Sequence, residues 1–456
     1  MCERDTVRGH LGDFAERLLT PMIVGESPIL AKSLWLETAG QAVEYVPLSG
    51  PAKADVCIVG AGFTGLSAAL HLAESGRSVV VLDSQQPGWG ASGRNGGQVV
   101  PGIKATPRFL ERVFGRNGAT RVIEFVDGSA AFTFDLIDRY GIECDATRSG
   151  WIQAAATPKS FGRLAERSRQ ADAKRAGLEL LDASSMEERT GSPAYLGGLL
   201  DPRGGMVHPL KYARGLANCV TTKGGTIHGL TPALGIEGDA GDLRVRTSQG
   251  IVHCRTVVLA TNAYANDIVP IVRRSVVPLI SIQIASAPLP DALRASILPR
   301  DMSVADVRRL TIYFRCDPEG RLVFGGRGWF NERANRRFVD HLKKQALELF
   351  PSLSGEVDWR YHWGGRVGLT TGHLPRLSEV RPGVLAGFGY NGRGVAMATL
   401  MGRVVADSIC GCPPEALHFP LTKLHPIPFH RLHRLGVAAT IGLYRLRDQL
   451  DARHGR

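Results

Sequence analysis

The spacing of apolar residues switches from a strand-like to a helical pattern, and back again, between residues 54 and 83. Val56–Val59 make a short apolar run, and a glycine-rich turn follows it. The next stretch carries small and apolar residues at helical spacing up to Gly76, and Ser78–Leu82 is apolar again. This pattern predicts a strand, a turn, a helix and a second strand, as in the opening unit of a dinucleotide-binding domain.

Similar patterns place elements along the rest of the chain. Helical spacing occurs in four stretches: 108–140, 155–190, 210–224 and 395–409. Strand-like runs occupy 255–264, 275–288, 309–327, 383–389 and a hairpin over 243–254 that turns at Ser248–Gly250. Residues 197–209 are rich in turn residues and predict a turn-rich connection. The first 50 residues lack a sustained period and predict an extension that wraps the surface.

The order of these elements predicts a discontinuous dinucleotide domain, because a strand and helix of the same type return about 300 residues after the first strand. We expect two intertwined domains between an N-terminal extension and a tail. The expected divisions are 1–50 for the extension, 51–107, 200–272 and 378–412 for the dinucleotide domain, 108–199 and 273–377 for a substrate domain, and 413–456 for a basic tail.

The composition is that of an ordinary globular protein, with 44% hydrophobic and 21% charged residues in 456. No apolar run is long enough to cross a membrane, and the first residues do not have the pattern of a signal peptide. The eight cysteines have no metal-ligand spacing, and a CxC at Cys410 and Cys412 is more simply two incidental thiols. We therefore expect a cytoplasmic protein with reduced cysteines and no metal.

The net charge of +12 does not predict a nucleic-acid partner, because the basic residues are dispersed and no nucleic-acid-binding motif accompanies them. An anionic substrate or cofactor explains the excess better. The tail from Leu421 is an exception, with seven Lys or Arg residues against Asp448 and Asp451. A docked terminal helix is the simpler interpretation, although a weak peripheral contact with an anionic membrane stays open.

The turn after the first strand has the GxGxxG spacing, at Gly60, Gly62 and Gly65. Gly60 permits the tight turn, Gly62 lets backbone approach phosphate, and Gly65 lets the helix pack on the strand. The helix N-terminus then presents unpaired N–H groups to the anion. Asp83 follows the second strand, where a carboxylate accepts ribose hydroxyls and repels a 2′-phosphate. FAD or NAD is therefore favoured over NADP.

Two more glycine-rich stretches offer backbone donors with little side-chain bulk. Residues 88–98 read GWGASGRNGGQ and suit a polar ring or a phosphate pressed against the backbone, with Arg94 available to an anion. Residues 387–407 read GFGYNGRGVAMATLMGRVVAD, a glycine turn that opens a helix rich in small residues. The dipole of that helix would point at a developing negative charge, such as the one near N1 of a reduced flavin.

Together with VHPLKYARGLA, LATNAYANDIVP, WGGRVGLTTGHLP and the tail IPFHRLHRLGVAATIGLYRLRD, these segments resemble the D-amino acid oxidase superfamily, and within it the gamma-glutamylputrescine oxidase branch. The resemblance covers roughly residues 33–450. It implies an α/β fold, with a Rossmann-like FAD-binding domain of the glutathione reductase type and an α+β substrate domain on a mostly antiparallel sheet. It also implies oxidation of an amine or amino acid by hydride transfer to flavin N5, followed by hydrolysis of the imine.

The resemblance carries site residues with it. It implies that FAD is held without a covalent bond, with Leu234 in the strand that meets adenine. The cofactor-binding residues it implies, together with the glycine turns, are Gly60, Gly62, Phe63, Thr64, Gly65, Asp83, Ser84, Gly90, Ala91, Ser92, Arg94, Asn95, Gly96, Gly97, Gln98, Leu234, Thr261, Gly389, Asn391, Gly392 and Gly394. The residues expected to surround the reacting amine are Tyr313, Trp363, Tyr390, Gln283 and His373. Arg327 and Arg366 could receive a carboxylate or amide of the substrate.

Two departures from the superfamily leave alternatives open. Several oxidases of the superfamily place a lysine over the flavin, but this chain has none between Asn266 and His341, so oxygen or another acceptor could reoxidise the flavin. Cys316 raises the possibility of covalent attachment, although an incidental cysteine is the simpler explanation. The alternatives are a D-amino acid or sarcosine-like dehydrogenase that passes electrons to a quinone or carrier, and a non-catalytic flavin-binding assembly or sensor protein.

Overall fold

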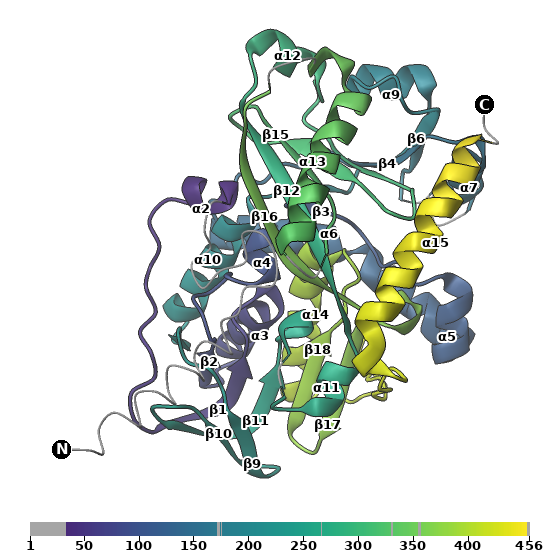
Figure 1. The fold of residues 1–456 in the computed structure, drawn as a ribbon. Coiled ribbons are helices and arrows are strands. Elements are labelled where there is room, and N and C mark those ends of the chain that lie inside the picture. Colours follow the sequence, from purple (N-terminus) through teal and green to yellow (C-terminus); the bar gives the residue numbers. More distant parts are fainter. Residues whose placement is uncertain are drawn as a thin grey trace.

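The computed structural model describes residues 33–170, 174, 176–265, 267–329, 332–353 and 357–453. Two large β-sheets dominate them (Figure 1). The first contains β1 (Ala52–Val59) at its centre, between β11 (Ile251–Leu259) and β2 (Val79–Leu82), both parallel to it. The other strands of this sheet are β8 (Thr226–His228), β9 (Gly235–Asp239), β10 (Asp242–Arg246), β17 (Arg376–Arg381) and β18 (Val384–Phe388).

The first sheet confirms the predicted Rossmann-like unit and the return of a late strand. Its order is β17-β18-β11-β1-β2-β8, so β18 lies two strands from β1 although more than 300 residues separate them in the sequence. The predicted hairpin is also present, because β10 and β11 pair in antiparallel register. The carboxyl ends of β1, β2 and β11 lie at one edge of the sheet, which is where α/β sheets bind ligands.

Small residues bring two distant helices together on this sheet. Helix α14 (Gly394–Ile409) packs on α3 (Phe63–Glu74), and a Cβ on Gly402 would lie 2.7 Å from the Ala68 amide nitrogen. Ser67 donates a hydrogen bond of 2.7 Å to the Thr399 carbonyl across the same contact. The close packing sets the N-termini of both helices at the carboxyl edge of the first sheet.

The second sheet is largely antiparallel, with the order β16-β12-β15-β14-β13-β4-β6-β5. Its strands are β4 (Trp151–Ala155), β5 (Glu179–Asp182), β6 (Gly197–Asp201), β12 (Val277–Pro288), β13 (Ser303–Asp306), β14 (Tyr313–Cys316), β15 (Arg321–Arg327) and β16 (Trp359–Leu369). The strands predicted over 275–288 and 309–327 are confirmed. The prediction for 155–190 is wrong at β5, and the prediction for 197–209 is wrong at β6, where a buried strand replaces the connection.

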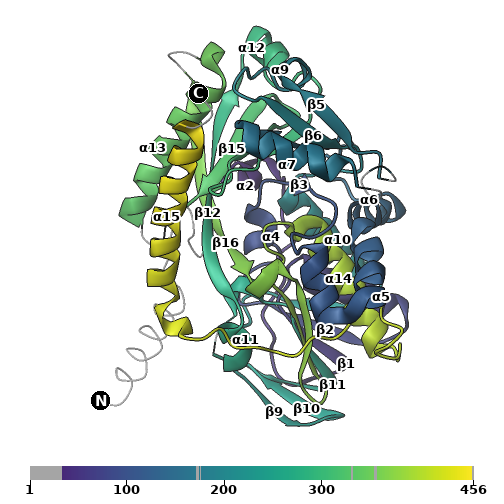
Figure 2. The same ribbon diagram turned by 90° about the vertical axis from the view of Figure 1, so that its right-hand side faces the viewer.

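Helices cover both sheets. The outer face of the second sheet packs against α13 (Glu332–Leu349), and α15 (His433–Arg453) lies along the outside beside it (Figure 2). None of the helices among the described residues is both long and apolar enough to cross a bilayer. The other described helices are α2 (Leu34–Thr38), α4 (Ala91–Arg94), α5 (Pro107–Asp127), α6 (Ser129–Tyr140), α7 (Pro158–Ser168), α9 (Ala183–Thr190), α10 (Pro209–Thr222), α11 (Pro270–Arg274) and α12 (Asp291–Ser296).

Two groupings differ from those expected. Helices α5 and α6, which we expected in the substrate domain, share the first core, because Leu110, Val122 and Phe134 pack with α3 and α14. The N-terminal segment does not only wrap the surface, since Leu34 and Trp35 of α2 are fully buried before the chain runs along the outside to β1 (Figure 1). Residues 1–32 of the expected extension lie outside the described residues.

Candidate active site

A cavity of about 1560 Å³ extends from the carboxyl edge of the first sheet to the second sheet and α15. Val59, Leu82 and Ala260, at the ends of three parallel strands, line one end. Ser281, Tyr313 and Arg327 of the second sheet line the other. The volume exceeds the ~300–1000 Å³ of a typical small-molecule pocket, so the cavity has room for a dinucleotide and a substrate.

The first glycine turn forms the floor of this cavity. Gly60 has a positive φ of 112°, and Gly62 is the N-cap of α3 without any side-chain cap. A Cβ on Gly62 would meet the Ser92 hydroxyl at 2.8 Å, and that hydroxyl accepts the Phe63 amide at 3.0 Å, so Ser92 leaves no room for a side chain at position 62. Gly65 lies outside the cavity wall, where a Cβ would come 1.9 Å from the Gly60 carbonyl oxygen. The predicted packing role of Gly65 accounts for that position.

Asp83 lines the cavity at the end of β2. Its carboxylate accepts hydrogen bonds from the Ala61 amide at 2.6 Å and the Gln85 amide at 2.9 Å. Burial raises the pKa of Asp83 to about 6, although both amides oppose that shift. Each carboxylate oxygen keeps a lone pair for a further donor, so the group can still accept a ribose hydroxyl.

The loop at 88–98 lines the cavity through most of its predicted residues. Gly97 does not, since a Cβ there would meet the Val207 carbonyl oxygen at 2.1 Å. Arg94 is 1% exposed, and its guanidinium donates to the carbonyls of Trp89 and Gly364. These two contacts use two of the five N–H donors of the guanidinium, and Arg94 is among the residues that line the cavity.

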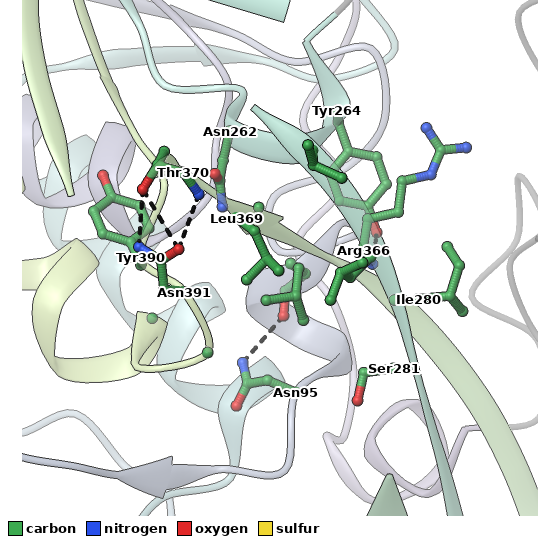
Figure 3. A pocket seen from close by; sticks show the side chains of 18 of the residues that line it. Asn95, Asn262, Tyr264, Ile280, Ser281, Arg366, Leu369, Thr370, Tyr390 and Asn391 are labelled. Atoms are coloured by element: carbon green, nitrogen blue, oxygen red, sulfur yellow. Dashed lines mark hydrogen bonds between the residues drawn. The ribbon is translucent and has the colours of Figure 1, made fainter. Parts of the chain in front are cut away.

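The third glycine turn reaches the cavity at Asn391, Gly392 and Gly394. Asn391 has a positive φ of 55° and its side-chain oxygen accepts the Thr370 amide at 2.9 Å (Figure 3). Tyr390 also lines the cavity, with its hydroxyl 2.6 Å from that of Thr64 on α3. Gly389 lies behind the wall, where its amide donates to Asn262 at 2.9 Å.

The far end of the cavity corrects the prediction for Leu234. Thr231, Pro232 and Ala233 line the cavity, whereas Leu234 does not. The Leu234 amide donates to the Arg246 carbonyl at 2.7 Å and is therefore not available to adenine. The residues that line the cavity at this point are therefore the three that precede Leu234.

The second sheet contributes polar side chains from neighbouring strands. Ser281 pairs with Arg327 in the register of β12 and β15, and the Ser281 hydroxyl lies 2.8 Å from that of Tyr313. Gln283 is 1% exposed; its Nε2 donates to the Arg94 carbonyl, and its Oε1 has no hydrogen-bond partner. Such an orphaned acceptor at a cavity wall predicts a donor on the bound ligand.

Trp363 does not line the cavity, contrary to the expectation. It is fully buried against Trp35 and donates its indole N–H to the Arg94 carbonyl at 3.0 Å. His373 does line the cavity, with a positive φ of 55°, and burial, reinforced by the nearby Lys104, lowers its pKa. Cys316 is 2% exposed in the second core, and none of the described cysteines is among the lining residues.

Positive charge dominates the cavity wall, with eight Lys or Arg side chains against Asp83 and Asp306. No sequence motif singles out Lys104, which reaches the N-terminus of α14: a Cβ on Gly392 would lie 3.5 Å from its Nζ. The Lys104 side chain is exposed, but partial desolvation by the surrounding atoms, reinforced by Arg393, lowers its pKa to about 8. Lys104 is thus a cation at neutral pH that loses its charge at moderately alkaline pH.

A pH profile tests whether the positive charge of Lys104 attracts a negatively charged substrate into the cavity. For a substrate that carries a carboxylate, kcat/KM should fall as the pH rises through about 8, because Lys104 is charged below its pKa and neutral above it. Lys104→Met should remove this transition, whereas Lys344→Met on the exposed face of α13 should keep it. An alkaline limb that persists unchanged in Lys104→Met would contradict the assignment.

The residues present fit FAD. Neither N-cap residue, Gly62 of α3 or Arg393 of α14, caps its helix N-terminus with its own side chain, and Asp83 keeps acceptor capacity at the end of β2. An uncapped helix N-terminus binds anions such as a diphosphate. The fold and the cavity therefore define a dinucleotide-dependent enzyme of the doubly wound α/β class.

Residues 55–408 match the family described as FAD dependent oxidoreductase (DAO), and the chain belongs to that family. It is 33% identical to Gamma-glutamylputrescine oxidoreductase of Escherichia coli, over 90% of this chain and 97% of that protein. It is also 33% identical to Probable oxidoreductase OrdL of Haemophilus influenzae, over 83% and 88% of the two chains. Glycine oxidase from Bacillus cereus has a similar fold, with a TM-score of 0.67 and 21% identity over 82% of this chain and 99% of that one. The protein is thus an oxidoreductase with FAD as cofactor, acting on amines or amino acids.

Proposed function

We propose that this enzyme oxidises the CH–NH bond of an amine that carries a distant carboxylate, as in gamma-glutamylputrescine. When bound, FAD would supply the two-electron acceptor for a hydride from the carbon beside the nitrogen, and water would hydrolyse the imine product. The relative named Gamma-glutamylputrescine oxidoreductase supports the substrate class. The free state of the described cysteines supports a reducing, cytoplasmic setting.

The polar residues of the second sheet have distinct roles in this proposal. Gln283 accepts an N–H of the substrate through its orphaned Oε1. Burial raises the pKa of Tyr313 to about 12, so its hydroxyl stays protonated and can donate to the substrate. Arg327 remains a cation although burial lowers its pKa to about 10, and it binds the carboxylate. Positioning, rather than proton transfer by the protein, accounts for catalysis.

The excess of cations on the cavity wall is the observation that carries the proposal. A substrate bearing only ammonium groups would be repelled, whereas a carboxylate offsets the repulsion. Steady-state assays should therefore give gamma-glutamylputrescine a kcat/KM roughly 100-fold above that of putrescine. Equal kcat/KM values for gamma-glutamylputrescine and putrescine would contradict the proposal. A higher kcat/KM for D-alanine or sarcosine would favour a D-amino acid or sarcosine-like dehydrogenase.

The C-terminal tail carries several exposed apolar side chains among basic residues. Phe429, Leu432, Leu435 and Leu443 are 84%, 55%, 68% and 45% exposed, an unusual density of exposed apolar side chains. Basic residues accompany them, and no acid occurs between Glu415 and Asp448. We propose that this segment binds an anionic membrane surface, where a quinone could accept electrons in place of oxygen.

Vesicle sedimentation tests the membrane contact. The holoenzyme should bind vesicles with 40% phosphatidylglycerol, roughly tenfold more tightly than vesicles of phosphatidylcholine alone. A double variant, Leu432→Asp with Leu435→Asp, should abolish the binding, and Leu347→Asp on α13 is the matched control. Equal affinity for both kinds of vesicle, or unchanged binding by the double variant, would refute the membrane contact.

A further inference from the structure

Helix α2 lies against the loop at residues 94–97, far from it in the sequence. Trp35 is 1% exposed, and its indole N–H donates to the Asn95 carbonyl at 2.8 Å. The Trp35 ring contacts Trp363 edge-on at 5.8 Å, and the Arg315 guanidinium lies 5.1 Å above it. These contacts fix the indole between the second sheet and the loop, so its N–H has a defined direction.

The carbonyls of Arg94, Asn95 and Gly97 in this loop all accept hydrogen bonds. The Arg94 carbonyl accepts from Trp363 and Gln283, and the Gly97 carbonyl accepts from Arg315 at 3.3 Å. A trans peptide directs its N–H opposite to its C=O. Holding the Asn95 carbonyl on Trp35 therefore turns the Gly96 amide to the other side, and Gly96 lines the cavity.

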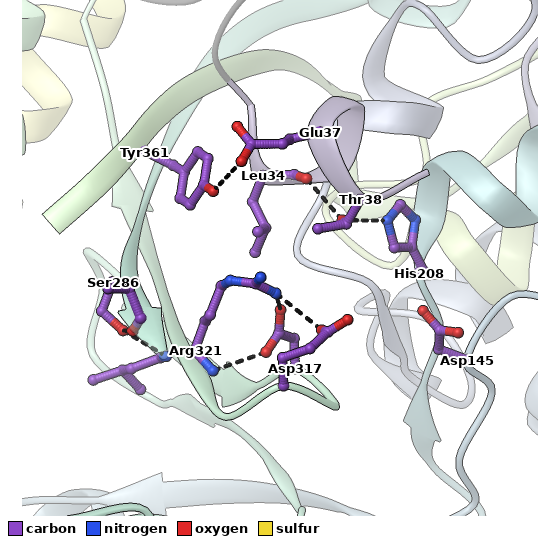
Figure 4. Close-up of polar contacts among 12 residues, drawn as sticks. Leu34, Glu37, Thr38, Asp145, His208, Ser286, Asp317, Arg321 and Tyr361 are labelled. Carbon is purple, nitrogen blue, oxygen red and sulfur yellow. Dashed lines mark hydrogen bonds and ion pairs between the residues drawn. The ribbon is translucent and has the colours of Figure 1, made fainter. Parts of the chain in front are cut away.

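Side-chain hydrogen bonds in turn hold α2 in place (Figure 4). Tyr361 donates to the Glu37 carboxylate at 2.8 Å, and the Thr38 hydroxyl lies 2.9 Å from Nε2 of His208. Nδ1 of His208 accepts the Lys211 amide, so Nε2 carries the proton and donates to Thr38. His208, at the start of α10 in the first core, and Tyr361, on β16 of the second sheet, thus both hold the helix that carries Trp35.

We propose that Trp35 is a positioning residue for the cofactor: through the Asn95 carbonyl it sets the Gly96 amide toward the redox ring of FAD. The N-terminal segment then supports the flavin site, although Trp35 does not itself line the cavity. The proposal rests on the FAD site and not on the identity of the amine.

The test compares Trp35→Phe, which keeps an aromatic ring and removes the N–H, with Trp359→Phe, the same change at a position on β16 that packs against the second core. Titration of the apoprotein with FAD should give a Kd about fivefold higher for Trp35→Phe, with a shifted flavin midpoint potential, and wild-type values for Trp359→Phe. Unchanged Kd and potential in Trp35→Phe, or equal shifts in both variants, would overturn the proposal. If Trp35→Phe does not fold, Ser33→Ala, which removes the cap of α2, replaces it, and an unchanged Kd overturns the proposal in the same way.

Discussion

Gly65→Ala should yield a protein that does not retain FAD and whose free energy of unfolding is lower by about 3 kcal/mol. The added Cβ would lie 1.9 Å from the Gly60 carbonyl oxygen and 3.2 Å from Ile58 Cγ2. Backbone cannot move aside as a side chain does, so α3 must shift from β1 and carry its N-terminus away from the diphosphate. Flavin absorbance per protein and urea denaturation measure the two effects.

Gly162→Ala is the matched control, because a Cβ at that helical position has nothing within 4 Å. It should keep FAD and gain up to about 1 kcal/mol from the higher helix propensity of alanine. If Gly65→Ala keeps a full complement of FAD with wild-type stability, the packing of α3 on β1 is not what holds the diphosphate site together.

Arg327→Met should lower kcat/KM for gamma-glutamylputrescine roughly 100-fold, equivalent to about 3 kcal/mol, mainly through KM. The side chain lies on the cavity wall beside Ser281, and its Nε has no hydrogen-bond partner in the described structure. A carboxylate supplies the missing acceptor and a charge-assisted hydrogen bond. Methionine has similar length and flexibility, so the change removes charge with little loss of packing.

Arg360→Met, an exposed position on β16 paired with Asp358, provides the control and should leave KM unchanged. Putrescine, which lacks the carboxylate, separates recognition from general damage: Arg327→Met should not weaken its turnover. An equal loss with both substrates would show that Arg327 supports the sheet and does not bind the carboxylate.

The dinucleotide unit was predictable because its signals are local. A positive φ at Gly60, a helix start at Gly62 and an acid after a short apolar strand are each encoded within a few residues. The same holds for the start of α14. The fold class and the cofactor therefore follow from the sequence with few errors.

The strands of the second sheet were harder to predict, because glycine occurs both in turns and at closely packed positions inside strands. Gly197 and Gly198 in β6 suggested a turn, yet a Cβ there would meet Phe161 at 2.3 Å and Met186 Sδ at 2.4 Å. These glycines allow close packing inside a buried strand. A sequence pattern does not distinguish that use from a turn, since the neighbours come from distant helices.

The errors at the site have a similar cause. Trp363 lies opposite Gln283 in the sheet, but its ring contacts Trp35 of α2, more than 300 residues away, and its indole N–H donates to the Arg94 carbonyl. Lys104 enters the site from a stretch without any motif, so a search for a cation in 266–341 could not find it. Tertiary contacts, not local pattern, decide which polar side chains meet.

Anaerobic mixing of the purified holoenzyme with gamma-glutamylputrescine, followed by flavin absorbance, tests the central claim most directly. The account predicts rapid bleaching of the flavin that is complete before any acceptor is added, and slower or absent bleaching with putrescine. A flavin that dithionite reduces but that neither gamma-glutamylputrescine nor any other carboxylate-bearing amine bleaches would contradict the claim that this cavity oxidises such amines.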